Sequence, residues 1–428
     1  MRRSYVLLVG AVAAAGGLTL LDAKGGPGTA SHIAGAALAA APGTTAVAAP
    51  TRIPGPGEAI PAARPTPGAP TGSVDGVDVN RTDTIRRVGD HYESVLPDGR
   101  IARLTLDPLL QDLAEHLLDQ SRAPRGAIVV MAPDGRILAL AGRRTEDTAG
   151  GKTGTFDWHL ATDAWAPAAS VFKLVTASAL VSKGVDPDGK VCFHGGLRSV
   201  SEQNLVTDKR DSRCESLAYG VAHSQNAIVG KLAYQNLQPA ALDAEAKMLG
   251  LTASVALGIP GMAGMAGEMT LPQQHDLAFA QAAAGFRGAR LSVLGGALLA
   301  STFANAGEQP QPRLVASIDG QPVPIAAPRR AIPADAARAV ARMMVGTCAN
   351  GTAAKTFGSG HVQVAGKTGT LTTTEPFYME HSWFVGFAPA DRPQIIVSVL
   401  LGNPQSWYLR GHEAARRLID LALGPKQS

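Results

Sequence analysis

The first clear pattern along the chain is a strand followed by a helix. Residues 101–106 have the character of a short strand. Asp107 and Pro108 then supply a helix N-cap and a first-turn proline whose backbone angle suits a helix. Leucines follow at helical spacing as far as Leu118. The pattern therefore predicts a helix that begins directly after Asp107.

A hairpin and a long helical region come next. Two apolar runs, 127–132 and 137–141, flank the turn Pro133-Asp134-Gly135, and this arrangement predicts a β-hairpin. From about 170 to 305 the pattern is mostly helical and rich in alanine.

Strands return near the C-terminus, where short runs are rich in Val, Ile and aromatic residues. These runs cover 362–370, 382–387 and 395–401, and an amphipathic helix at 413–423 follows them. Strands at both ends of the domain and helices between them predict an α/β fold of the α+β type. We expect one antiparallel sheet, assembled from distant segments and packed against helices, with a helical subdomain inserted between its halves.

The N-terminal segment, 1–23, has the composition of a membrane anchor. Arg2 and Arg3 precede an uncharged, mostly apolar run from Ser4 to Leu21. Because Leu21-Asp22-Ala23 is a poor cleavage site, a single uncleaved anchor is favoured over a cleaved signal. The two arginines predict that the rest of the chain lies outside the cytoplasmic membrane.

A linker separates this segment from the folded part of the chain. Residues 24–76 are dominated by Gly, Ala, Pro and Thr, and eight prolines lie between Pro42 and Pro70. Such a composition cannot bury a core, so it predicts an extended linker. We expect a short lead-in segment at 77–105 and the folded domain at 106–428.

Composition excludes several classes of protein. The net charge is only +4 and Lys and Arg do not cluster, so we expect no nucleic-acid binding. The ten histidines lack metal-ligand spacing and the three cysteines form no C-x-x-C pair, so no metal or other cofactor is expected. Cys192 and Cys214 can form a disulfide in an oxidising compartment, which leaves Cys348 unpaired. Because sequence does not fix the geometry of a bridge, that pairing stays open.

Ser170 and Lys173 lie at the start of an apolar helix predicted to run from Ala169 to about Gly184. Their spacing places both side chains on one helix face. A serine hydroxyl is a poor nucleophile until a base takes its proton, and a lysine is such a base where burial and a second cation lower its pKa. The helix N-terminus also offers N–H groups to an oxyanion. Taken alone, an S-x-x-K string more often marks an exposed lysine on an ordinary helix.

A second pair of polar residues, Ser224 and Asn226, follows in the string Ala-His-Ser-Gln-Asn-Ala. A second hydroxyl can relay a proton between a lysine and a leaving group, and an amide can both donate to and accept from a substrate peptide. The alternative is that Ser224 only caps the next helix.

The third candidate is the string Lys367-Thr368-Gly369-Thr370, which ends the predicted strand run 362–365. Its lysine would bring a second positive charge to the serine–lysine pair, and its threonine hydroxyls can hold a substrate carboxylate. Gly369 would leave room for a substrate backbone beside the strand. Two backbone N–H groups are expected to form an oxyanion hole, those of Ser170 and Thr370.

The same four letters also occur earlier, as Lys152-Thr153-Gly154-Thr155. This copy precedes Ser170 and lies in Gly-rich sequence without a strand pattern. We therefore expect a solvated loop there, with no part in the site.

The order S-x-x-K, S-x-N and K-T-G resembles the signature of penicillin-binding proteins and serine β-lactamases. The likeness extends beyond the motifs. The segments 103–111 and 126–131 are similar to the opening of the transpeptidase domain in high-molecular-weight penicillin-binding proteins. The segments before and after the third motif, 303–315 and 381–389, also resemble that family. The resemblance covers about residues 100–425.

This resemblance implies a β-lactamase/transpeptidase-like fold and a serine D,D-transpeptidase. Such an enzyme crosslinks peptidoglycan stem peptides, is acylated by β-lactams, and lies outside the cytoplasmic membrane, where a glycosyltransferase is a possible partner. The implied roles are nucleophile for Ser170, base for Lys173, proton relay for Ser224, donor-peptide binding for Asn226, and carboxylate binding for Lys367, Thr368 and Thr370.

Other readings of the motifs stay in view. A serine β-lactamase must activate a water molecule, and no Glu-x-x-Leu-Asn element lies between Asn226 and Lys367 to do so. A β-lactam sensor would need a cytoplasmic signalling part, and only Met1 to Arg3 are expected on that side of the membrane. The intact motifs argue against an inactive relative. A D,D-carboxypeptidase stays open, because sequence does not distinguish a water from an amine acceptor. We expect no glycosyltransferase domain, since the segment between linker and domain is too short for one.

Overall fold

The folded part of the chain is seen in a computed structural model, which describes residues 85–145, 155–359, 362–375 and 377–424. The predicted anchor and linker lie outside these ranges, as do Lys152, Thr153 and Gly154 of the duplicate motif. No helix within the described ranges is long and apolar enough to span a bilayer. The described residues fall in one compact unit, Gly72–Ser428.

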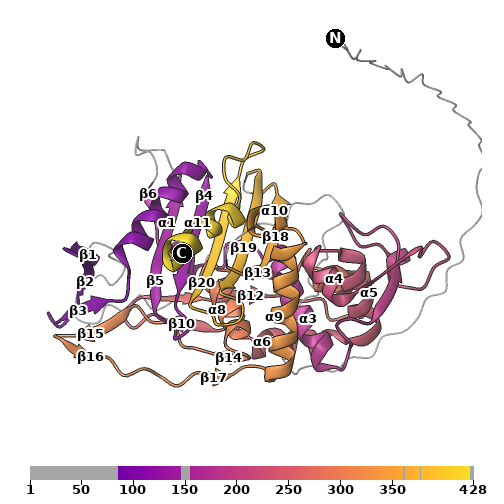
Figure 1. Ribbon diagram of the computed structural model, residues 1–428, viewed down its shortest axis with the longest axis horizontal. Coiled ribbons are helices and arrows are strands. Elements are labelled where there is room, and N and C mark those ends of the chain that lie inside the picture. Colours follow the sequence, from indigo (N-terminus) through magenta and orange to yellow (C-terminus); the bar gives the residue numbers. More distant parts are fainter. Residues whose placement is uncertain (1–84, 146–154, 360–361, 376, 425–428) are drawn as a thin grey trace, which may run out of the picture. The chain divides into compact units, whose positions relative to one another are not determined.

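A six-stranded antiparallel sheet forms the centre of this unit, in the order β18-β19-β20-β4-β5-β6 (Figure 1). Strand β4, from the N-terminal hairpin, pairs with β20 near the C-terminus, so the predicted sheet of distant segments is confirmed. The strands are β4 (Arg125–Met131), β5 (Ile137–Arg144), β6 (Thr155–Phe156), β18 (Ala365–Thr373), β19 (Met379–Ala388) and β20 (Ile395–Asn403).

Helices cover both faces of this sheet. Successive side chains of a strand point to opposite faces, so Val129 packs in the core that contains α8 (Val293–Ala304), whereas Ile128 packs in a separate core. That second core is shared with α1 (Pro108–Ser121) and α11 (Gly411–Leu423), which lie together over one face (Figure 1). Burial on both faces explains why the central strands read as continuous apolar runs.

The predicted start of the first helix is confirmed. The carboxylate of Asp107 accepts hydrogen bonds from the backbone N–H groups of Leu109 (2.9 Å) and Leu110 (3.0 Å), and Pro108 is the first residue of α1. The cap satisfies two N–H groups that have no partner inside the helix.

A helical region lies between the two halves of the sheet in sequence, which confirms the predicted insertion. Helices α3, α4 and α5 form a group next to α9, and α9 in turn packs on β18 (Figure 1). The elements are α2 (His159–Thr162), the 3-10 helix η2 (Ala169–Phe172), α3 (Lys173–Ser182), the 3-10 helix η3 (Glu202–Asn204), α4 (Leu217–Ala222), α5 (Asn226–Asn236), α6 (Pro239–Met248), α7 (Leu277–Ala283), α8, α9 (Ala334–Ala349) and α10 (Ala354–Phe357).

Short strands also occur within this region, which the helical pattern did not predict. They pair as β8 with β9, β10 with β11, and β14 with β17, whereas β13 pairs with β12 on one side and β7 on the other. Their bounds are β7 (Ala166–Pro167), β8 (Lys190–Phe193), β9 (Arg213–Ser216), β10 (Ser254–Ala256), β11 (Ala263–Met265), β12 (Gly267–Met269), β13 (Ala289–Leu291), β14 (Glu308–Gln309) and β17 (Arg329–Arg330).

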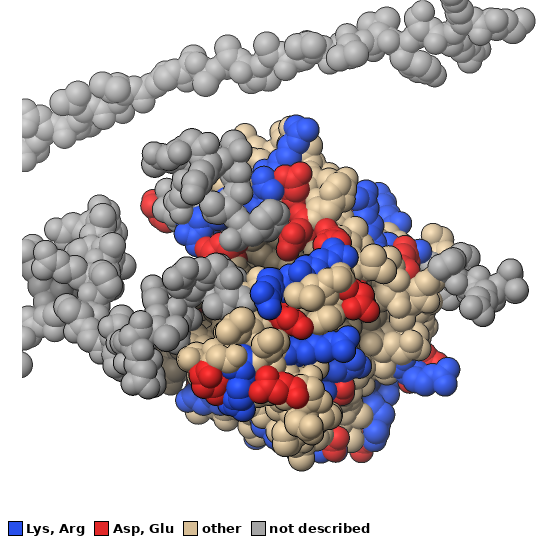
Figure 2. Space-filling view, turned by 90° about the vertical axis from the view of Figure 1, so that its left-hand side faces the viewer, with Lys and Arg blue, Asp and Glu red and all other residues tan. Residues whose placement is uncertain are grey.

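The segment expected as a lead-in contributes to a second sheet, in the order β1-β2-β3-β15-β16. Acidic and basic side chains are interspersed over the face of the molecule that carries it (Figure 2), as in the Arg87–Asp112 ion pair of 2.8 Å. The strands are β1 (Ile85–Val88), β2 (His91–Val95), β3 (Ile101–Leu104), β15 (Val315–Ile318) and β16 (Gln321–Pro322).

Three predicted boundaries differ from the structure. The K-T-G-T string does not end a strand but lies inside β18, because the pairing of this segment with β19 continues to Thr373. The helix expected from Ala169 begins as the 3-10 turn η2 and becomes α-helical only at Lys173. Thr155, expected in a loop, pairs with Arg144 in the short strand β6.

Candidate active site

The first motif forms a direct contact between its two polar residues. Lys173 Nζ donates a hydrogen bond to Ser170 Oγ over 2.8 Å, because the turn η2 places the serine one helical turn before the lysine. The same amine donates to Asn226 Oδ1 (2.7 Å) and to the carbonyl oxygen of Ala284 (2.6 Å). Three acceptors therefore hold a lysine side chain that is fully buried.

The environment of Lys173 favours its neutral form. Burial, and after it the positive charge of Lys367, lower the pKa of Lys173 well below the ordinary 10.5. The three acceptors are a hydroxyl, an amide and a carbonyl, none of which carries a charge that would compensate. In the neutral form the amine has two N–H groups, which can donate to Asn226 and Ala284, and its lone pair can take the proton of the Ser170 hydroxyl.

The backbone before the serine is held in an unusual conformation. Ala169 has a φ of 49°, in the left-handed region that residues with a side chain seldom adopt. The indole of Trp383 donates to the carbonyl oxygen of Pro167 over 2.9 Å, which fixes the preceding strand β7 to β19.

The second motif lies at the start of α5. The N-cap of this helix is Gln225, not Ser224, so the capping alternative for the serine is wrong. Ser224 has a φ of 55°, and its hydroxyl accepts a hydrogen bond from Lys367 Nζ over 3.1 Å. Asn226 Nδ2 donates to the carbonyl oxygen of Leu197 over 2.7 Å. The amide of Asn226 thus connects Lys173 to the segment that contains Leu197.

The third motif brings a second buried lysine to the site. Lys367 is fully buried on β18, and its amine donates to Ser224 Oγ and to the carbonyl oxygen of Thr368 (2.8 Å). Burial lowers the pKa of Lys367 to about 7. The structure therefore joins the three motifs through two sets of hydrogen bonds. One set contains Ser170, Lys173 and Asn226, and the other contains Ser224 and Lys367.

The missing side chain of Gly369 makes room for a different neighbour from the one that the sequence suggested. A Cβ atom on this residue would approach Val171 Cγ2 at 3.3 Å and Ala169 Cβ at 3.4 Å. The missing side chain thus makes room for η2, which packs against β18, and not for a substrate in the cleft. The neighbouring threonines, Thr368 and Thr370, do line the cleft, as alternation along a strand requires.

A cleft of about 580 Å³ opens beside these residues. Five predicted site residues line it, namely Ser170, Ser224, Asn226, Thr368 and Thr370. The described side chains around it are all neutral or basic. Strand β18 lies at the edge of the sheet and contacts η2, and Ser170 and Thr370 from these two elements both line the cleft.

Several cleft residues were not predicted from the sequence. Thr352 follows α9 and its hydroxyl lies 2.5 Å from that of Thr368. One wall is formed by Trp407, Arg410 and His412, and the backbone N–H of Gly411 fixes this wall to Ser382 Oγ over 3.0 Å. The only sequence signal for this wall is its position just before the predicted C-terminal helix.

The structure also decides the open question about the cysteines. Cys192 and Cys214 form a disulfide between β8 and β9, whereas Cys348 is free and buried. No cluster of three His, Cys, Asp or Glu side chains suited to a metal ion occurs among the described residues.

Comparison of the chain with known protein families identifies the class of protein. The family model described as the penicillin-binding protein transpeptidase domain matches residues 126–421. The chain therefore belongs to the penicillin-binding protein transpeptidase family, as the motif order indicated.

Individual proteins are similar over most of the chain. Peptidoglycan D,D-transpeptidase PbpA of Mycobacterium tuberculosis is 25% identical over 353 residues, which cover 74% of this chain and 70% of that protein. The D,D-transpeptidase domain of a peptidoglycan glycosyltransferase from Eggerthella lenta is 26% identical, with a TM-score of 0.61 over 76% of this chain and 83% of that one. A ceftriaxone acyl-enzyme complex of penicillin-binding protein A from M. tuberculosis shares the fold, with 23% identity and a TM-score of 0.61 over 76% of this chain and 80% of that one.

Proposed function

We propose that the chain is a serine D,D-transpeptidase that crosslinks peptidoglycan stem peptides through an acyl-enzyme on Ser170. The observation that carries this proposal is the 2.8 Å hydrogen bond from the buried amine of Lys173 to Ser170 Oγ, beside a cleft of about 580 Å³. The related M. tuberculosis protein is named a peptidoglycan D,D-transpeptidase, and the M. tuberculosis complex holds ceftriaxone as an acyl-enzyme. Both facts support the same chemistry here.

In the first step Ser170 Oγ attacks the carbonyl carbon of the peptide bond between the two terminal D-alanines. Neutral Lys173 accepts the hydroxyl proton, and burial favours this neutral form because it lowers the pKa of the amine well below 10.5. The backbone N–H groups of Ser170 and Thr370 stabilise the oxyanion. A C–O bond to the serine forms, the C–N bond breaks, and D-alanine leaves.

The leaving amine needs a proton, and in this proposal Ser224 delivers it. Lys367 Nζ already donates to Ser224 Oγ, so the hydrogen of the serine hydroxyl is free to point to another acceptor. Ser224 passes this hydrogen to the leaving nitrogen and receives the proton held by Lys173. The buried charge of Lys367 stabilises the negative charge that develops on the substrate during this transfer.

In the second step the amine of another stem peptide attacks the ester carbonyl carbon. The new C–N bond forms, the C–O bond to Ser170 breaks, and a proton of the amine passes through Lys173 to Ser170 Oγ. In the first step, before D-alanine leaves, Asn226 binds the donor peptide, and the hydroxyls of Thr368 and Thr370 bind the carboxylate of its terminal D-alanine together with Lys367. Thr352 supports this set, because its hydroxyl lies 2.5 Å from that of Thr368 and orients it.

The location of the reaction is part of the same proposal. Residues 1–23 anchor the chain in the cytoplasmic membrane, residues 24–76 act as a linker, and the domain works on the outer side with a membrane glycosyltransferase as partner. The disulfide between Cys192 and Cys214 supports an oxidising compartment. Protease added to intact spheroplasts should remove the domain, and full protection would contradict this location.

The deciding experiment uses a labelled stem-peptide analogue with and without an amine acceptor. A transpeptidase forms crosslinked product when the amine is present, and Ser170→Ala abolishes that product. Release of D-alanine with water as the sole acceptor, even at high amine concentration, would instead identify a D,D-carboxypeptidase.

A further inference from the structure

The segment between β8 and β9, residues 194–212, forms one side of the cleft. Leu197 and Arg198 of this segment line the cleft next to Asn226. The segment also packs tightly on the start of α5, since a Cβ atom on Gly196 would lie 2.2 Å from Ala227 Cβ. A shift of the segment would therefore be felt at the first turn of α5.

Leu197 determines how the amide of Asn226 is oriented. The Leu197 carbonyl accepts a hydrogen bond from Asn226 Nδ2 (2.7 Å), which directs Oδ1 at the other end of the amide to Lys173 Nζ (2.7 Å). A carbonyl accepts from the NH₂ end of an amide but not from its oxygen, so this contact selects one of the two amide orientations. If Leu197 moved away, the lysine would lose the acceptor that holds it in line with Ser170.

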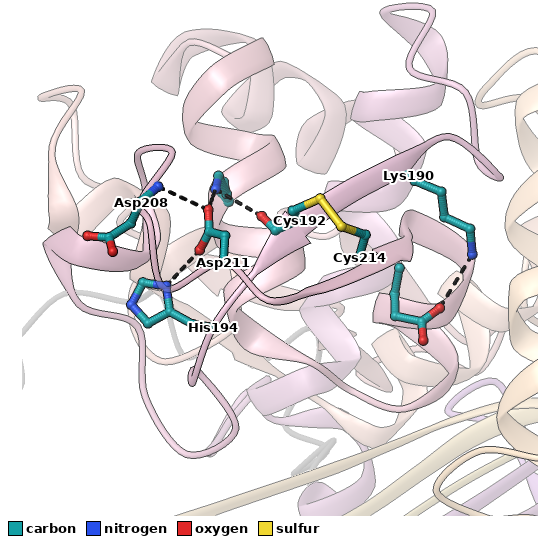
Figure 3. The surroundings of a disulfide bond; sticks show 8 residues. Lys190, Cys192, His194, Asp208, Asp211 and Cys214 are labelled. Carbon is teal, nitrogen blue, oxygen red and sulfur yellow. Dashed lines mark hydrogen bonds and ion pairs between the residues drawn. A yellow bond between two sulfur atoms is a disulfide. The ribbon is translucent and has the colours of Figure 1, made fainter.

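A buried ion pair anchors the segment to the same helix that carries Asn226. Lys231 Nζ and Asp211 Oδ2 are 2.7 Å apart, and their side chains are only 3% and 4% exposed. The lysine also donates to the carbonyl oxygen of Cys192 over 2.9 Å, and Asp211 Oδ1 lies 2.7 Å from His194 Nδ1 (Figure 3). These contacts tie both ends of the segment to α5.

The disulfide closes the base of the same segment. Cys192 and Cys214 are directly opposite each other in the β8–β9 pair (Figure 3). Lys231 donates to the backbone carbonyl of Cys192. A buried ion pair is costly to desolvate unless its hydrogen bonds are satisfied, and here both partners have additional partners. Neither charged residue lines the cleft, so their contacts define a support and not a substrate site.

We propose that Asp211 and Lys231 are positioning residues for acylation, which hold segment 194–212 so that the Leu197 carbonyl orients Asn226 toward Lys173. The inference rests on the proposed function only in that acylation of Ser170 is the measured step. It assigns to this pair an effect on the rate of the chemical step in addition to any effect on stability.

The test compares Asp211→Asn with Lys190→Met in the full chain. Lys190 lies in the same hairpin and pairs with Glu215 over 3.4 Å, but its side chain is 63% exposed, so its loss removes a weak surface ion pair. Stopped-flow labelling with a fluorescent penicillin gives three quantities: the first-order acylation constant, the apparent binding constant and the fraction of protein that can be labelled.

For Asp211→Asn we expect the first-order acylation constant to fall about tenfold or more, since small misplacements of catalytic groups have large effects on rate. The control Lys190→Met should retain the wild-type constant. A variant that only folds poorly would show a smaller labelled fraction with an unchanged rate constant, and this result would overturn the proposal.

A double-mutant comparison tests the route through Asn226. If Asp211 acts through that amide, then Asp211→Asn should cause little further loss in an Asn226→Ala background. Losses that multiply in the double variant would overturn the proposal. If the wild-type chain forms no adduct on Ser170, the proposed function itself is contradicted. If the wild type forms the adduct and only the prediction for Asp211→Asn fails, the positioning role alone is contradicted.

Discussion

The carbonyl oxygen of Ala169 occupies the space in which a side chain of Gly285 would begin. A Cβ atom built on Gly285 would lie 2.0 Å from that oxygen, and Gly285 itself has a φ of 90°. The contact fixes the backbone immediately before Ser170, on the side where Ala284 accepts from Lys173. The backbone nitrogen of Ser170 lies 3.3 Å from the same built Cβ atom.

Gly285→Ala should therefore reduce acylation by about 100-fold, because the added methyl group displaces the Ala169–Ser170 backbone. Gly184→Ala is the matched control, since Gly184 has a similar φ of 88° but no atom within 4 Å of a built Cβ. Both variants carry the backbone strain of an alanine at positive φ. Equal acylation rates in the two variants would show that the contact with Ala169 does not position Ser170. Labelled-penicillin kinetics gives the comparison.

The duplicated K-T-G-T string offers a second pair of matched variants. Lys367→Ala should lower β-lactam acylation by about 100-fold or more, because it removes a buried cation and the hydrogen bond to Ser224. Lys152→Ala should leave acylation close to wild type. Gel fluorescence after a short labelling pulse measures both, and equal damage would mean that the third motif has been assigned to the wrong copy.

Lys367 should also make stability depend on pH. Its pKa is about 7 in the folded chain and 10.5 as an ordinary lysine, so between these values the unfolded state binds more protons than the folded state. Stability from this group therefore rises with pH across the window from 7 to 10.5.

Urea unfolding of wild type and Lys367→Met at pH 7 and pH 9.5 checks this sign. The free energy of unfolding of the wild type should rise relative to that of the variant as the pH increases, because methionine cannot titrate. A difference between the two proteins that stays constant with pH would contradict the lowered pKa.

The acyl-enzyme formed with penicillin should persist for many minutes. Acylation needs the hydroxyl, base, oxyanion hole and cations that the three motifs provide, whereas deacylation by water needs a further general base. The described side chains that line the cleft are neutral or basic and include no carboxylate. Intact-protein mass spectrometry after a penicillin pulse should show an adduct that is missing in Ser170→Ala. Rapid loss of the adduct with catalytic antibiotic turnover would identify a β-lactamase.

The disulfide should contribute substantially to stability. Cys192 and Cys214 are separated by 22 residues, and closing a loop of this size stabilises a folded chain by about 3 kcal/mol. Serine at both positions should lower the free energy of unfolding by about that amount, as measured in urea. A reducing agent should destabilise the wild type but not the double variant, since Cys348 has no bridge to lose.

Local signals explain what could be predicted of the fold. Asp107 and Pro108 define a helix start within a few residues, and the Pro133-Asp134-Gly135 turn defines the β4–β5 hairpin. The boundaries of β18 were harder to predict, because its length depends on pairing with β19 and not on its own apolar residues. The six short strands among the middle helices, β8–β13, were missed for the same reason.

The candidate site was predictable to the extent that it resides in motifs. Ser170, Lys173, Ser224, Asn226 and Lys367 meet in the structure, as their order along the chain suggested. The carbonyl of Ala284, which accepts from Lys173, gives no signal, because any residue supplies a backbone carbonyl and this one lies 111 positions away.

Lys231 was the one support residue with a visible signal. It is a lone charge in the apolar run of α5, Ala227 to Ala233, where a buried lysine requires a partner. Sequence does not identify Asp211 as that partner, because the two residues meet only when the β8–β9 hairpin folds back on α5.

The pairing of β4 with β20 has a consequence for the time at which the site forms during synthesis. Strand β18 is joined to the β4–β5 hairpin only through β19 and β20, so the sheet is incomplete until residues 395–403 have left the ribosome. A nascent chain that ends before residue 395 contains all three motifs but lacks the strand that unites the sheet. Since pairing of such distant segments is slow, the chain passes through a long interval in which its apolar strands are exposed. The three motifs are therefore united in one completed sheet only after β20 has paired with β4.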